Sequence, residues 1–190
     1  MQRYFASINN NQVMLSKDDE HHLLHVMRMR VGDEIEVVDS SRLFLCRIDS
    51  LSPLIISTIH EIKKDVELAS DITLLFALTK GDKTDLVLQK ATELGAKKIA
   101  LIESERTVVT LLNKDQDKKL ARYKKIMKEA SEQSHRLCVP ELLGVYELKN
   151  LPTSLQSDLN YVAYEKDAGM TTDSFKEVQK GQSISVLIGP

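Results

Sequence analysis

The chain has 190 residues, 42% of them hydrophobic and 28% charged, a composition typical of a soluble globular protein with one large domain or two small ones. No apolar run reaches the roughly 20 residues that span a bilayer, and the N-terminus lacks the apolar stretch of a secretory signal. The formal net charge of −2 gives no global sign of a nucleic-acid-binding protein. Cys46 and Cys138 lie far apart in sequence, which favours free thiols in a reducing cytoplasm, where we expect the protein to act.

The first third of the chain predicts a small barrel-like sheet with one helix. Short alternating or apolar runs bounded by turn residues predict strands at 3–8, 12–15, 34–38, 43–48 and 55–62. Ser16 is placed to cap a helix with an acidic first turn. Leu23, Leu24 and Met27 follow at helical spacing and predict its buried stripe. We therefore expect a first domain of residues 1–66.

After a polar linker candidate at 62–71, the pattern changes. Continuous apolar runs predict strands at 72–78, 99–102, 161–164 and 184–188, and amphipathic segments predict helices at 83–94, 114–135 and 172–180. Strands that alternate with helices and are apolar on both faces are typical of a parallel sheet with helices on each side. The expected fold class is therefore α/β, with a second domain of residues 72–190.

The last residues, Ser185-Val186-Leu187-Ile188-Gly189-Pro190, resemble a strand that feeds a glycine-bearing ligand loop. A buried strand does not normally end a natural domain where its turn begins. We therefore expect a chain shortened at its C-terminus, with an incomplete ligand site at this strand end.

The helix predicted at 83–94 carries an apolar stripe that is expected to be buried. Leu86, Val87, Ala91 and Leu94 form this stripe, and Lys90 lies on its edge. Lys90 either extends its ammonium group to water or is held at a cleft by Glu93, three residues further on.

The helix predicted at 114–135 carries two parallel stripes. The apolar stripe consists of Leu120, Tyr123, Met127, Ala130 and Leu137. The second, which we call the polar stripe, consists of Arg122, Ile126, Glu129, Gln133 and Arg136. Arginine and glutamine contact phosphates and base edges, but an intramolecular Arg–Glu network would give the same pattern. The seven basic residues between Lys114 and Lys128 likewise fit a solvated helix face or a phosphate-contacting one.

Three histidines, His21, His22 and His25, cluster on the first helix. Two of them have the i, i+4 spacing of metal ligands, but the sequence offers no clear third ligand, so we expect no metal. His25 fits better at the edge of the core or against RNA.

Several strings, in this order, resemble one known family along the whole chain. They are Arg3-Tyr4-Phe5, the segment 22–33 (HLLHVMRMRVGD), Lys80-Gly81-Asp82-Lys83, the segment 89–95 (QKATELG), Glu105-Arg106, the segment 129–136 (EASEQSHR), Pro140 and Leu187-Ile188-Gly189-Pro190. Together they resemble the 16S ribosomal RNA uridine N3-methyltransferase family (RsmE) of the SPOUT superfamily.

The resemblance implies a PUA-like RNA-binding barrel followed by a SPOUT-type α/β methyltransferase domain with a trefoil knot. It also implies S-adenosylmethionine as methyl donor, 16S rRNA or the 30S subunit as substrate, and a homodimer with sites at the subunit interface. The chain departs from the family after Gly-Pro, where the family continues into a Glu-Gly-Gly loop, a strand and a last helix. We therefore expect the 190-residue chain to leave the knot open, to bind the cofactor weakly or not at all and to be inactive.

The resemblance also suggests roles for particular residues. The expected cofactor-binding residues are Leu187, Ile188, Gly189 and, after the strand at 161–164, Glu165. The expected catalytic residues are Arg122, Glu129, Gln133 and Arg136, with Glu129 as first choice of base, because N3 methylation needs a proton acceptor and fixed donors around the base. The expected RNA-binding residues are Arg3, His25, Arg28, Arg30, Lys80, Lys83, Lys90 and Arg106. Two alternatives stay open: an RNA-binding module without catalysis, and an α/β enzyme that uses another nucleotide at Gly189.

Overall fold

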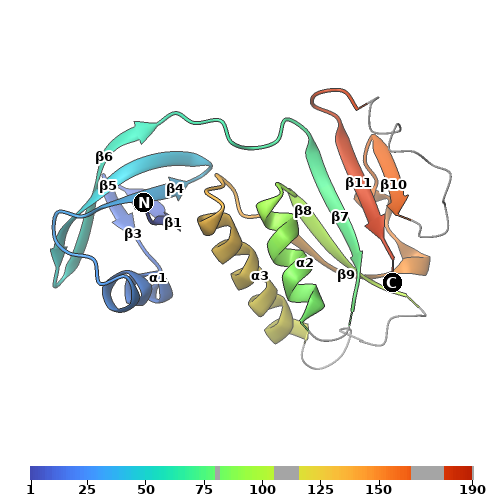
Figure 1. Cartoon of the computed structure of the whole chain (residues 1–190), viewed down its shortest axis with the longest axis horizontal. Coiled ribbons are helices and arrows are strands. Elements are labelled where there is room, and N and C mark those ends of the chain that lie inside the picture. The colour runs from blue at the N-terminus through green and yellow to red at the C-terminus, as the bar shows by residue number, and fades with distance from the viewer. Residues whose placement is uncertain (80–81, 105–115, 164–177, 190) are drawn as a thin grey trace. The chain divides into compact units, whose positions relative to one another are not determined.

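We analysed a computed structural model of the chain, which describes residues 1–79, 82–104, 116–163 and 178–189 (Figure 1). The chain divides into two compact units. The first unit comprises Met1–Val66 and Ser131–Cys138, and the second comprises Glu67–Ala130 and Val139–Pro190. The sequence did not predict that residues 131–138 pack with the first unit. No helix in the described ranges is long and apolar enough to cross a membrane.

The first unit is a curled six-stranded sheet with one short helix. Its elements are β1 (Arg3–Phe5), β2 (Ser7–Asn9), β3 (Gln12–Met14), α1 (Lys17–His21), the π-helical turn η1 (His22–Val26), β4 (Glu34–Asp39), β5 (Arg42–Leu51) and β6 (Leu54–Ile62). The strand order is β1-β4-β5-β6-β3-β2. β1 and β2 lie at opposite ends of this order, yet only Ala6 separates them along the chain. The sheet must therefore curl into a barrel, as predicted.

Turn and cap residues fix this topology locally. Two of the hairpins turn at Asn10-Asn11 and at Ser40-Ser41, where both central residues have positive φ, as type I′ turns require. Ser16 caps α1 as predicted, because its hydroxyl accepts a hydrogen bond from the Asp19 amide at 3.2 Å. Of the predicted stripe, Leu23 is fully buried, whereas Met27 is 45% exposed because it follows the π-helical turn.

In its described residues, the second unit forms a five-stranded, all-parallel sheet with the order β10-β11-β7-β8-β9. Its elements are β7 (Asp71–Ala77), α2 (Lys83–Glu93), β8 (Lys98–Glu103), α3 (Gln116–Gln133), β9 (Glu141–Glu147), the 3₁₀ turns η2 (Leu148–Asn150) and η3 (Thr153–Leu155), β10 (Leu159–Ala163) and β11 (Ser183–Ile188). The α/β class is confirmed. The sequence missed β9, an edge strand with Gly144 at its centre and side chains that are only half-buried. The helix predicted at 172–180 lies mostly outside the described residues.

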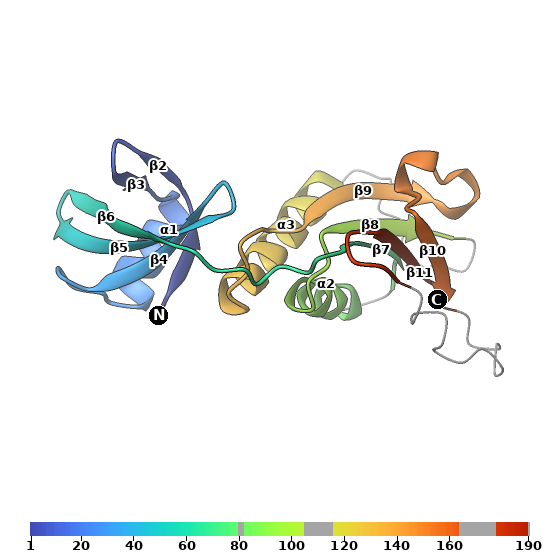
Figure 2. The ribbon, with the colours of Figure 1, turned by 90° about the horizontal axis from the view of Figure 1, so that it is seen from above.

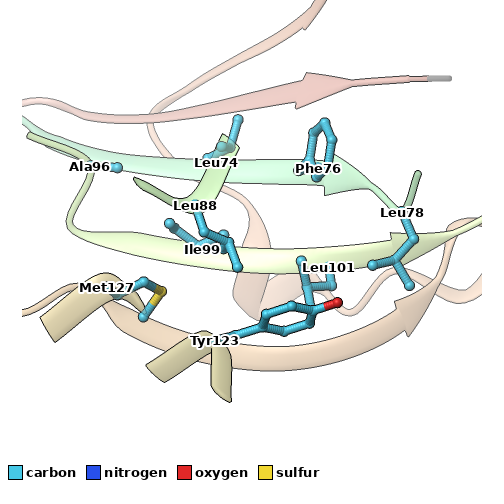
Figure 3. Packing of buried hydrophobic residues seen from close by; sticks show 9 residues of the cluster. All are labelled: Leu74, Phe76, Leu78, Leu88, Ala96, Ile99, Leu101, Tyr123 and Met127. Atoms are coloured by element: carbon cyan, nitrogen blue, oxygen red, sulfur yellow. The ribbon is translucent and has the colours of Figure 1, made fainter. Parts of the chain in front are cut away.

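Helices α2 and α3 lie side by side on one face of this sheet (Figures 1 and 2). Their core contacts are drawn in Figure 3, where Leu88 of α2 and Tyr123 and Met127 of α3 face Leu74, Phe76, Ile99 and Leu101 of the strands. On the opposite face, Leu75 and Ile102 pack against Leu151, which follows η2, and against Leu155 of η3. Helices on each side were predicted, but in the described ranges both α-helices of this unit lie on one side.

The buried row of α2 differs from the predicted stripe. Leu88 is fully buried between Thr84 and Thr92, whereas Leu86 and Leu94 are 55% and 77% exposed. The fully buried row is turned by roughly 100°, about one residue, from the predicted stripe, and Val87 and Ala91 of that stripe are partly buried against the core. Gly95 ends α2 as predicted, with φ +100, because a Cβ there would come within 2.7 Å of the Leu68 side chain.

Candidate functional site

The carboxyl ends of the parallel strands form the edge where α/β proteins bind ligands. Ile188 on β11 pairs with Ala163 on β10 and with Phe76 on β7. The carboxyl ends of these three strands therefore lie side by side at one edge of the sheet. Phe76 pairs in turn with Leu101 on β8. Three of the predicted site residues, Lys80, Arg106 and Glu165, follow these strands directly and lie outside the described residues.

The predicted cofactor residues that are described lie at this edge. Leu187 is half-buried against Leu75, and Ile188 is 37% exposed. Val162, opposite Leu187 on β10, is 66% exposed, so the sequence missed an apolar side chain at the same edge. A Cβ built on Gly189 would meet no described atom within 4 Å. Among the described residues, the edge therefore offers exposed apolar surface at the ends of β10 and β11.

The polar stripe of α3 is exposed over most of its length. Arg122, Glu129 and Gln133 are all exposed, and at 100° per residue they lie within about 40° of one another around the helix. The Arg122 guanidinium donates to the Asp85 carboxylate on α2. Asp85 was not predicted as a partner of Arg122, because the periodicity of one sequence does not show which helix packs next to α3.

The fourth predicted catalytic residue, Arg136, does not continue the stripe. His135 adopts φ +56 and ends α3, and the Arg136 amide donates to the Ser131 carbonyl at 2.9 Å. Arg136 is consequently 5% exposed, and its guanidinium donates to the Cys138 sulfur at 3.2 Å. A substitution at Arg136 would therefore affect packing in the first unit as well as any chemistry.

Arg3 is also buried, with a side chain that has no exposed surface. Its guanidinium donates to the Glu36 carboxylate at 2.7 and 2.9 Å and to the backbone carbonyls of His135 and Arg136. Burial alone would raise the pKa of the Glu36 carboxyl, but the Arg3 hydrogen bonds and charge, with a smaller contribution from His135, lower it below its ordinary value. Arg3 therefore ties Ser131–Cys138 to the barrel, and we do not propose it as an RNA contact.

The direction of α3 decides which stripe residues lie near the cofactor edge. α3 connects two adjacent parallel strands, β8 and β9, so it runs from the carboxyl edge towards the amino edge. Arg122 lies near its start, next to the first turn of α2. At 1.5 Å per residue, Glu129 and Gln133 are about 10 and 16 Å further along the axis. Of the stripe, only Arg122 lies close to the edge that holds Leu187, Ile188 and Gly189.

Apart from the buried Arg3, the predicted RNA-binding residues of the barrel lie in the turn η1 and in the loop that follows it. His25, Arg28 and Arg30 are exposed, and the Arg30 amide donates to the Asp33 carboxylate at 2.7 Å, which orders the loop. Exposed apolar side chains surround them, among them Val26 at 59%. Guanidinium groups next to apolar surface suit RNA, which presents phosphates and unstacked bases.

The predicted RNA-binding lysines of the second unit lie on α2. Lys83 and Lys90 are both exposed. Lys90 donates to Glu93 at 2.7 Å, and this hydrogen bond lowers the pKa of the Glu93 carboxyl. Of the two alternatives left open for Lys90, the structure shows the contact with Glu93, but on an exposed helix face where Lys90 also reaches water.

The histidine cluster has a structural contact. The Tyr4 hydroxyl lies 3.1 Å from His22 Nδ1, and burial raises the pKa of Tyr4. The rings of His21 and His25 are 4.8 Å apart. Among the described residues, no three His, Cys, Asp or Glu side chains gather as metal ligands would.

Comparison with known proteins matches both units. Residues 66–190 match the model of an RNA methyltransferase domain, and residues 15–56 match that of an RNA methyltransferase PUA domain. The chain is 33% identical to the ribosomal RNA small subunit methyltransferase E of Bacillus subtilis, over 100% of this chain and 80% of that protein. It is 29% identical to the ribosomal RNA small subunit methyltransferase E 2 of Borreliella burgdorferi, over 90% and 70%.

A solved structure extends the match to the fold. The crystal structure of a ribosomal RNA small subunit methyltransferase E from Neisseria gonorrhoeae, bound to S-adenosylmethionine, is 26% identical and superposes with a TM-score of 0.81 over 99% of this chain and 80% of that one. A small barrel with an exposed basic loop and a parallel sheet with an open ligand edge together fit an enzyme that acts on RNA. The chain belongs to the RNA methyltransferase family, by the match of its second unit and by its identity to the Bacillus protein.

Proposed function

We propose that this protein methylates N3 of a uridine in the RNA of the small ribosomal subunit, with S-adenosylmethionine as methyl donor. The observation that carries the proposal is the match of residues 66–190 to an RNA methyltransferase domain, on a sheet in which β11 ends at the ligand edge. The names of the Bacillus and Neisseria relatives support ribosomal RNA as substrate.

The cofactor fits the carboxyl edge of the second unit. Val162 and Ile188 offer exposed apolar surface there for the adenosine. S-adenosylmethionine, when bound, supplies an electrophilic methyl group. The protein mainly has to orient the uridine and exclude water.

The uridine must lose its N3 proton, and the resulting charge is shared with O2 and O4. The exposed carboxylate of Glu129 is our choice of proton acceptor, and the amide of Gln133, one turn further, suits the base edge. Arg122, held by Asp85, supplies a fixed positive charge for O4 or a phosphate. Because N3 is hidden in a base pair, the target must be unpaired or flipped out.

We further propose that a homodimer forms the site. Within one chain, Glu129 lies about 10 Å along α3 from Arg122, away from the cofactor edge. A second copy that brings its own α3 to this edge would bring the carboxylate and the methyl donor together. Mixing two inactive variants, Glu129→Gln and Ile188→Glu, should then restore part of the activity. No recovery in verified mixed dimers would contradict a shared site.

Methyl transfer to 30S particles that lack the modification is the main test. This proposal is opposed to the expectation that the 190-residue chain is inactive, and it requires 3-methyluridine in the digested RNA and competition by S-adenosylhomocysteine. Glu129→Gln should lower turnover by about 100-fold or more if Glu129 is the base. Lys124→Ala, exposed on α3 but off the polar stripe, is the control and should retain activity. RNA binding without any methyl transfer would instead favour a non-catalytic RNA-binding module.

A further inference from the structure

A hollow of about 460 Å³ lies at one end of the barrel, in the first unit. It is lined by Ser41, Arg42, Leu43, Glu61, Ile62, Lys63, Lys64, Asp65 and Leu137. It is distinct from the loop that carries Arg28 and Arg30. That loop leads into the start of β4, where the Gly32 amide donates to the Ile48 carbonyl on β5. The hollow lies at the other end of β4, where Arg42 is the strand neighbour of Asp39. The two ends of β4 are about 17 Å apart by strand length.

Arg42 is held as a rigid flat group at the rim of this hollow. Its Nε donates to Glu61 Oε1 at 3.0 Å, and its Nη2 donates to Glu61 Oε2. The carboxylate therefore fixes the guanidinium plane through two hydrogen bonds. One side of the plane lies over the Phe44 ring, 5.1 Å from its centroid. The Arg42 side chain is nevertheless 61% exposed, which leaves surface for a ligand.

The rest of the hollow combines apolar and cationic groups. Leu43 and Leu137 are both nearly buried and form an apolar floor with Ile62. Lys63 and Lys64 follow β6 directly and are exposed at the rim. With Glu61 committed to Arg42, the rim has an excess of positive charge, although Asp65 offsets one lysine.

We propose that this hollow is a second RNA-binding site, in which an unpaired base stacks on the Arg42 guanidinium while Lys63 and Lys64 contact the flanking phosphates. Unpaired RNA bases stack on arginine planes as well as on aromatic rings. A plane fixed by a carboxylate and a ring beneath it loses little conformational freedom when a base binds. An acidic protein partner would be attracted to the lysines but has no need of a flat, oriented guanidinium.

This inference rests on the proposed function only in taking RNA as the ligand, and its test needs no methyl donor. The probe is a single-stranded RNA of 12 nucleotides with one central 2-aminopurine, whose fluorescence falls when the base stacks. Arg42→Lys keeps the charge but removes the flat group. We expect it to weaken binding roughly five- to 100-fold, to reduce the fluorescence change and to leave the salt dependence unaltered.

Arg47→Lys is the matched control. Arg47 lies on the same strand, is 55% exposed and pairs with Asp49 at 3.3 Å, but among the described residues no ring lies beneath it. It should bind the probe as the unmodified protein does. Lys63→Gln and Lys64→Gln should each lower the salt slope, by about 0.7 per lost phosphate contact.

Several outcomes would overturn the stacking proposal. They are equal effects of Arg42→Lys and Arg47→Lys, a lowered salt slope in Arg42→Lys, equal binding of a probe with an abasic site at the central position, and absence of probe binding by the unmodified protein. None of them bears on methyl transfer to 30S particles, so failure of this site and failure of the proposed function remain distinguishable.

Discussion

The two units bury their strands in different ways. In the barrel, β5 exposes Arg42 and Arg47 but buries Leu43, Cys46 and Ile48, because one face of the strand meets solvent. In the parallel sheet, the inner positions of β7 and β8 are buried almost without interruption, because both faces are covered. The barrel can therefore present functional side chains along its strands, whereas the parallel sheet has to present them at its strand ends.

The units also differ in what their interiors contain. The barrel buries an ion pair, Arg3 with Glu36, and uses it to hold Ser131–Cys138. The core between the sheet and α2 and α3 is built from aliphatic and aromatic side chains. We therefore expect the second unit to be most sensitive to lost apolar volume, and the first to be sensitive to lost charge.

The largest effect should come from Leu88→Ala in the second unit. Leu88 is fully buried between α2 and the strands, so its truncation should leave a cavity and lower the free energy of unfolding by about 2–5 kcal/mol. Leu86→Ala, two residues earlier and 55% exposed, should change it by less than about 0.5 kcal/mol. Chemical denaturation of both variants checks this. Similar losses would contradict the rotation of α2 relative to its predicted stripe.

Arg3→Ala should have the next largest effect, in the first unit. It leaves the Glu36 carboxylate with only the longer contact to His135 and removes the Arg3 hydrogen bonds to two carbonyl groups, and should cost about 2–4 kcal/mol after allowance for the partial exposure of Glu36. The control is Arg47→Ala, which removes an exposed pair and should cost less than about 1 kcal/mol. If both variants melt at the same temperature, Ser131–Cys138 does not depend on Arg3.

The sequence predicted the elements better than the contacts between them. Strand runs, the Ser16 cap and the Gly95 helix end depend on neighbours within a few residues, and each was found as expected. β9 was missed because an edge strand is half-buried and lacks both clear alternation and a continuous apolar run. The rotation of α2 was missed because threonines, buried at Thr84 and Thr92, do not count as apolar in such a pattern.

The candidate site was less predictable, for physical reasons. The spacing of Arg122, Glu129 and Gln133 on one helix face is a local property, and all three are exposed on that face. The burial of Arg3 and Arg136 depends on contacts across about 130 residues of sequence, which periodicity does not report. An arginine that contacts RNA and an arginine in a buried ion pair cannot be told apart from the residue type alone.

A smaller effect should separate the two units in RNA binding. Replacing Arg28 and Arg30 together by Ala should weaken binding of ribosomal RNA on the order of tenfold and reduce the slope of log affinity against log salt by up to about 1.4. The double variant Lys83→Ala with Lys90→Ala, on the exposed face of α2, measures the same quantity for the second unit. An unchanged slope in the arginine variant would remove this loop of the barrel from the RNA contact.

The smallest effect should be a pH dependence of the barrel. The Arg3 hydrogen bonds and charge outweigh burial and lower the pKa of Glu36 in the folded state. A lowered carboxyl pKa stabilises the fold fully above the unfolded value of about 4.3, and this stabilisation is lost as the pH falls through the folded value. The free energy of unfolding should therefore decrease in that acidic window, and part of this decrease should disappear in Glu36→Gln. Denaturation curves measured at several pH values between neutral and strongly acidic give both slopes. Equal slopes for the unmodified protein and Glu36→Gln would contradict this prediction. They would mean that folding does not lower the pKa of Glu36 in spite of its two hydrogen bonds from the buried Arg3 guanidinium.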